Sequence, residues 1–263
     1  MYSVSDGRAN LYRNPSIATA YKSLENRQVA VAQESCGLHQ VELELWCQFL
    51  SLMTDGLDGP VELSTFGPGT DERQKLLLQL QILGSSIQSM KSALDLLVDG
   101  SYYAAFGSIR NLIESYLHIG YLELRPYSAW NWYQRADAES DAQKPLRVWE
   151  IVQALKNDPP FGLEGQIFEK AYQSWRWMCK GAHPSGEGIV LTSAGDGNYS
   201  FGATYNRTFF YDGVSNGFFA MRWLLICLHT LKPQEDSWGH QFAGLVNLVH
   251  EWTMKVLSEK NCD

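Results

Sequence analysis

Residues 71–98 carry the most regular apolar pattern in the chain. Apolar side chains recur there at alternating steps of four and three residues, and this spacing places them along one face of a helix. A face of this length has to be covered by a neighbour, so the pattern predicts a long helix packed lengthwise on another helix. The residues that form this heptad seam are Leu76, Leu80, Leu83, Ile87, Met90, Leu94 and Leu97.

The segment that follows the seam is a second apolar helix. Asp99–Gly100 interrupts the pattern, residues 101–124 resume it, and Pro126 ends it because proline lacks a backbone donor. A connection this short joins antiparallel helices, so a helix hairpin is predicted over 71–124. Further helices are predicted for an N-terminal arm within 1–35, for 39–53, 146–156 and 163–182, and for a C-terminal pair within 212–258. The helix predicted over 39–53 carries Val41 and Leu45 on its apolar face.

One segment has the alternating pattern of β-strands. Between residues 189 and 205, Tyr199, Phe201 and Ala203 alternate with small or polar residues, and Asp196–Gly197 suits a tight turn. We therefore predict a small β-hairpin insertion at about 189–205 in an otherwise all-α chain. The expected architecture is an antiparallel helical bundle of six or more helices that forms a single domain over residues 1–263.

The charge and cysteine content of the chain restrict its environment and its ligands. The formal net charge is −8, which argues against broad, non-specific binding of DNA, since such binding requires a basic surface. The five cysteines include no closely spaced pair, a usage typical of the reducing cytoplasm. The longest apolar run, Phe218–Leu231, contains Arg222 and is shorter than the roughly 20 residues that cross a bilayer. We expect a cytoplasmic protein with no membrane association.

Aromatic residues are numerous, with nine Trp and thirteen Tyr in the chain. Trp130, Trp132 and Tyr133 form an aromatic group with few charges nearby. Groups of this kind are typical of subunit interfaces, and most soluble oligomers are symmetric dimers. The sequence therefore predicts a homodimer.

Arg110, Glu114 and His118 form the first candidate site, because they stand four residues apart on the helix predicted over 101–124. This spacing places the three side chains in one stripe along the border of the apolar face, where neighbours can touch. One interpretation is a structural ion pair that holds this helix against its neighbour. The other is a ligand-binding wall for an anion or nucleotide, since the planar arginine fork suits phosphate.

Arg176, Lys180 and His183 form the second candidate site, near the end of the helix predicted over 163–182. His183 can serve as a C-terminal helix cap, or as a general acid or base with the two cations holding an anion. No spacing typical of metal ligands, dinucleotide loops or phosphate loops occurs. We predict no cofactor and assign no metal ligand; a metal site built from lone histidines of several helices is a further alternative.

Two motifs in the middle of the chain resemble those of a known group. The run Gly100-x-Tyr102-x-x-Ala105-x4-Arg110-x3-Glu114, followed by Gly181-Ala182-His183-Pro184-Ser185, resembles uncharacterised bacterial helical proteins. These are similar to the HEPN superfamily, the higher eukaryotes and prokaryotes nucleotide-binding helical bundles.

The resemblance implies a non-catalytic helical module that binds a nucleotide, an RNA end or a protein partner. It also implies an alternative, a metal-independent ribonuclease, because Arg176-x6-His183 fits the Arg-x(4–6)-His signature of the HEPN ribonucleases. The residue after Arg176 is Trp177, where active members usually carry a small polar residue.

Overall fold

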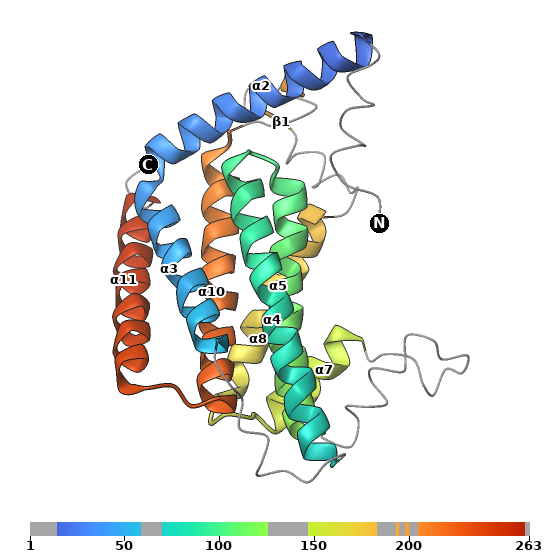
Figure 1. Cartoon of the computed structure of the whole chain (residues 1–263), viewed down its shortest axis with the longest axis vertical. Coiled ribbons are helices and arrows are strands. Elements are labelled where there is room, and N and C mark those ends of the chain that lie inside the picture. The colour runs from blue at the N-terminus through green and yellow to red at the C-terminus, as the bar shows by residue number, and fades with distance from the viewer. Residues whose placement is uncertain are drawn as a thin grey trace, which may run out of the picture.

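The computed structural model describes residues 15–58, 70–125, 147–182, 193–194, 198–199 and 205–260. The regular structure of this part of the chain is helical apart from one two-residue strand pair, which confirms the predicted all-α class. In Figure 1 most of the long helices run along a common direction, and the first helix crosses one end of them. The eight helices of the described ranges are α2 (Pro15–Leu38), α3 (Gln40–Leu57), α4 (Asp71–Val98), α5 (Tyr102–Leu124), α7 (Val148–Asn157), α8 (Gly165–Ala182), α10 (Arg207–Leu231) and α11 (Asp236–Lys260).

The α4–α5 hairpin confirms the prediction for residues 71–124, and local signals set its ends. The hydroxyl of Thr70 accepts a hydrogen bond from the backbone N–H of Arg73 at 3.4 Å, which satisfies a free donor at the start of α4. At its other end Gly100 adopts a φ of 73°, a left-handed conformation that favours glycine. The chain reverses there, and α5 packs against α4 and also against α7, α8 and α10.

Only one of the two predicted apolar rows of the heptad seam is buried in α4. Leu76, Leu83, Met90 and Leu97 are buried, but the second buried row consists of Gln79, Ser86 and Ala93. Leu80, Ile87 and Leu94 are half-buried at the edge of the core.

Gln79, the larger of the two polar residues in that row, has hydrogen-bond partners on α5. The Gln79 side-chain amide donates to the Ile119 carbonyl at 3.1 Å and to the Glu123 carboxylate at 3.2 Å. A buried amide is tolerated where such bonds are made, and Ser86 with Ala93 presents a small surface to the core. The packing of α4 thus follows side-chain size and hydrogen bonding as well as hydrophobicity.

Helix α10 lies inside the bundle and packs against α3, α4, α5 and α11. A side-chain carbon added at Gly217 would lie 2.3 Å from the ring of Trp46, so the missing side chain makes room for the indole. Among the described residues, α10 is the one helix whose length and composition would allow it to cross a membrane. More than half of its most apolar 18-residue stretch is buried inside the protein. A buried core helix meets the same criteria.

The strand pair does not support the predicted β-hairpin at 189–205. It comprises β1 (Ser193–Ala194) and β2 (Asn198–Tyr199), paired antiparallel over two residues each. A two-residue ladder forms too few hydrogen bonds to stand alone as a hairpin. Most of the predicted segment lies outside the described residues, and Tyr205 at its end is bonded to His39 at the start of α3, at 2.8 Å.

Candidate functional site

The structure brings together the first group of predicted residues at the contact between α5 and α8. The Nε of Arg110 lies 3.4 Å from Oε1 of Glu114, and each side chain is 29% exposed. The same carboxylate oxygen accepts a hydrogen bond from the indole of Trp175 on α8 at 2.7 Å. The predicted ion pair is therefore present within α5, and the hydrogen bond from Trp175 to Glu114 joins α5 to α8.

Burial controls the titratable groups beside this pair. Burial lowers the pKa of His118, although Glu114 acts in the opposite direction, so the neutral imidazole is favoured at pH 7. Burial likewise raises the pKa of the Cys179 thiol, against the effect of the adjacent Arg110 guanidinium. A neutral thiol is a poor nucleophile. The contacts of Glu114 show the ion pair of the first interpretation of the Arg110 stripe, and the ligand-binding wall of the second interpretation stays a prediction.

The second group of predicted residues is not assembled in the described part of the chain. Arg176 and Lys180 lie on the exposed side of α8. His183 lies outside the described residues, so its proposed role as a catalytic group or as a helix cap stays a prediction.

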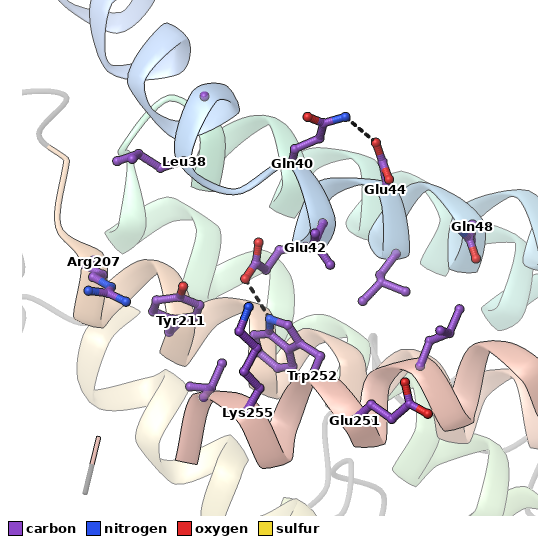
Figure 2. A pocket seen from close by; sticks show the side chains of 15 residues that line it. Leu38, Gln40, Glu42, Glu44, Gln48, Arg207, Tyr211, Glu251, Trp252 and Lys255 are labelled. Carbon is purple, nitrogen blue, oxygen red and sulfur yellow. Dashed lines mark hydrogen bonds between the residues drawn. The ribbon is translucent and has the colours of Figure 1, made fainter. Parts of the chain in front are cut away.

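A groove of about 630 Å³ lies elsewhere, between the first half of α3 and the second half of α11, with the start of α10 at one end. Figure 2 shows its side chains. Large apolar residues surround it: Leu38 is 60% exposed, Val41 57% and Leu248 46%. Its interior surface includes Leu45 and Trp252, both of which are buried in the core.

A buried carboxylate, Glu42, lies in the middle of the groove and ties its two walls together. Glu42 is only 7% exposed, and its Oε1 accepts a hydrogen bond from the indole of Trp252 on α11 at 2.7 Å (Figure 2). Its Oε2 lies 3.8 Å from Nδ1 of His39. Burial raises the pKa of this carboxyl, but hydrogen bonding by His39 and Trp252 outweighs burial and lowers the pKa overall. Glu42 is therefore ionised at pH 7.

His39 extends this polar group to the start of α10. Its Nε2 lies 2.8 Å from the hydroxyl of Tyr205, and its ring stacks on Phe210 with centroids 3.9 Å apart. These contacts fix the short connection between α2 and α3, where His39 lies. They position Glu42 one turn later on α3, so that its carboxylate meets Trp252.

The charges along the groove are unevenly placed. Figure 2 shows Arg207 at one end and Lys255 beside Trp252, whereas Glu44 and Glu251 lie toward the other end. With Glu42, the lining holds three carboxylates and two cations, which is a net charge of −1. The groove therefore combines apolar walls with a slightly negative potential, an arrangement that disfavours phosphate and suits an apolar ligand bearing a cation.

No motif in the sequence predicts this groove. Its walls come from residues 37–48, 207–211 and 248–256, which are far apart in the chain and contain no motif. The apolar spacing of residues 39–53 predicts a covered Val41, yet the structure leaves Val41 exposed at the edge of the groove. Its exposure is decided by where α11 packs, which the local pattern does not reveal.

The described ranges contain no group of three or more His, Cys, Asp or Glu side chains placed to hold a metal ion. Comparison of the chain with protein-family models, with curated proteins and with solved structures found no match. The candidate site therefore rests on its own geometry.

Proposed function

We propose that the protein is a non-catalytic helical module that binds an apolar segment of a partner protein in the groove between α3 and α11. The observation that carries this proposal is the group of exposed apolar side chains around the groove, formed by Leu38, Val41 and Leu248. Contiguous apolar surface of this kind is characteristic of protein-binding sites. Helices of partner proteins commonly bind in such grooves through their apolar faces.

Charge favours a protein over the other ligands that the HEPN resemblance implies. A nucleotide or an RNA end would bring phosphate groups next to Glu42, Glu44 and Glu251, in a groove whose net charge is −1. The chain as a whole carries −8, so long-range steering also opposes an anionic ligand. A protein segment avoids this repulsion. The HEPN-like assignment and the homodimer stay predictions, and the aromatic group at Trp130 lies outside the described residues.

The proposal is tested by selection followed by titration. Peptides of 16 residues are selected from an unbiased displayed library on the intact protein, and their affinities are then measured by fluorescence anisotropy. We expect Val41→Asp to weaken the selected peptides at least about tenfold, because it places a charge on the apolar wall.

The matched control is Val29→Asp on α2. Val29 is 56% exposed, against 57% for Val41, and it does not line the groove. It should leave the affinity unchanged. An equal loss in both variants, or a library that yields no binder, would show that the groove is not a docking site.

The non-catalytic part of the proposal is tested separately. Pure protein is incubated with mixed RNA in EDTA, beside a His183→Ala variant. We expect both samples to leave the RNA intact. Cleavage by the wild type that disappears in the variant would support the alternative, a metal-independent ribonuclease that uses Arg176 and His183.

A further inference from the structure

We infer that the partner segment is an amphipathic helix with a lysine or arginine beside its apolar face, and that Glu44 and Glu251 select this cation. The inference rests on the proposed function, because it concerns the same groove. It names the chemistry of the partner, which the exposed apolar walls by themselves do not specify.

The groove has the shape of a site for a short helix. The groove follows two helices that pack against each other, and in Figure 1 α3 and α11 lie side by side. Along α3 its lining runs from Gln40 to Gln48, which is a length of about 12 Å at 1.5 Å per residue. Two turns of a helix cover this distance.

The apolar side chains of the walls are spaced as a third helix requires. On α3, Val41 and Leu45 stand four residues apart, and on α11 Leu248, Trp252 and Val256 repeat the same step. Each row lies along one face of its helix. A guest helix with apolar residues at steps of three and four can place them between the two rows, as in helix-in-groove recognition.

Each wall of the groove also carries an exposed carboxylate. Glu44 comes from α3 and Glu251 from α11, and both are exposed residues of the groove lining. Figure 2 shows both toward the end of the groove that lies away from Arg207. Because each wall carries one of these carboxylates, a cation on either flank of the guest helix has an acceptor. A glutamate at the same position of the guest would meet a like charge.

The buried carboxylate is not the recognition group. Glu42 is already bonded to Trp252 at 2.7 Å and is almost inaccessible, so a guest side chain cannot reach it without breaking that bond. The exposed carboxylates lack this restriction, although the side-chain amide of Gln40 donates to Glu44 at 2.7 Å. That bond orients the carboxylate, which still has acceptor capacity for a guest cation.

The experiment uses three synthetic helical peptides with identical leucine positions. They differ only in the residue that flanks the apolar face, which is lysine, glutamine or glutamate. Binding to the full chain is followed by fluorescence anisotropy at low and at high salt. We expect the lysine peptide to bind about tenfold tighter than the glutamate peptide, with glutamine between them, and the difference to shrink at high salt.

The charge-reversal variant Glu44→Lys with Glu251→Lys should abolish or invert this preference. The matched control, Glu164→Lys with Glu235→Lys, changes the total charge by the same amount at two exposed carboxylates outside the groove, and it should preserve the wild-type order. Circular dichroism confirms that both variants are folded.

The outcomes separate the two proposals. Equal binding of the lysine and glutamate peptides, or a preference that survives the groove reversal, overturns the inference about charge and leaves the docking function standing. Failure of all three helical peptides, while library-selected peptides still bind at Val41, overturns the helical occupant. Failure of every peptide, the selected ones included, overturns the proposed function itself.

Discussion

Two regions of the molecule contain the same bond in different surroundings. At the α5–α8 joint the indole of Trp175 donates to Glu114 at 2.7 Å, and at the groove the indole of Trp252 donates to Glu42 at the same distance. Glu114 is 29% exposed and adjoins Arg110, whereas the Glu42 side chain is 8% exposed and adjoins His39. Each bond joins two helices, so the bond itself does not mark a functional site.

The surroundings of the two bonds can be compared through the described contacts. At Glu114 the indole donor Trp175 stacks on Tyr172, also on α8, with ring centroids 5.8 Å apart. Beside Glu42 the helices leave a groove of about 630 Å³. A predicted polar stripe can thus contribute a bond between two helices, while a glutamate that belongs to no motif can connect the two walls of a groove.

The largest difference between the two regions should appear when each carboxylate is removed. Glu42→Ala strands the buried Trp252 N–H and the His39 imidazole, and removing one partner of a buried charged group costs about 3–5 kcal/mol. Urea unfolding measures this loss. The control is Glu44→Ala, an exposed carboxylate two residues later, which should cost less than about 0.5 kcal/mol. Equal midpoints for the two variants would show that the Glu42 bond does not stabilise the fold.

Glu114→Ala should destabilise the protein less than Glu42→Ala does. Its loss leaves Trp175 without an acceptor and Arg110 without its carboxylate, but both members of the ion pair keep partial contact with water. We expect about 1–2 kcal/mol, because solvent screens a partly exposed pair. Urea unfolding of Glu114→Ala measures this loss of stability. A loss as large as that of Glu42→Ala would contradict the distinction drawn from exposure.

The two regions should also respond to acid in different pH ranges. Burial lowers the folded-state pKa of His118, so the unfolded chain binds a proton more readily and stability falls as the pH drops below about 6.5, the usual histidine value. Unfolding free energies between pH 7.5 and 5.5 should show this decline, and His118→Asn should reduce it. An identical decline in the variant would assign the effect to other groups.

Glu42 should act only at lower pH. Its folded-state pKa lies below the ordinary value, so its contribution is complete above about pH 4.5 and is lost as the pH falls through the folded pKa. Glu42→Gln keeps a hydrogen-bond acceptor for Trp252 but does not titrate. The wild type should therefore lose more stability than this variant between pH 5 and pH 3. Parallel curves would contradict an ionised Glu42 in the fold.

The smallest effect on stability is expected at the rim of the groove. Val41→Asp changes an exposed side chain, so its unfolding free energy should stay within about 0.5 kcal/mol of the wild type, although peptide binding is lost. This result would show that Val41 contributes to peptide binding and not to the stability of the core. A large destabilisation would mean that Val41 supports the packing of α11, and the binding loss would then have a structural cause.

The sequence by itself determined the helical elements, because their signals are local. Thr70 starts α4, Asp99–Gly100 ends it, and apolar spacing of four and three residues forms both helices of the hairpin. The predicted helices at 39–53, 146–156 and 163–182 correspond closely to α3, α7 and α8. The Arg110–Glu114 pair was also predictable, since side chains four residues apart on a helix are neighbours whatever the tertiary fold.

Only the tertiary structure decided which side of each helix is covered. In α4 it buries Gln79, Ser86 and Ala93 in place of Leu80, Ile87 and Leu94. It also leaves Val41 exposed and brings Glu42 to Trp252, 210 residues away in sequence. Local spacing indicates which side of a helix is apolar. Which line of side chains on that side becomes buried depends on how closely the neighbouring helices approach. The groove belongs to this second class, because it exists only where α3, α10 and α11 meet.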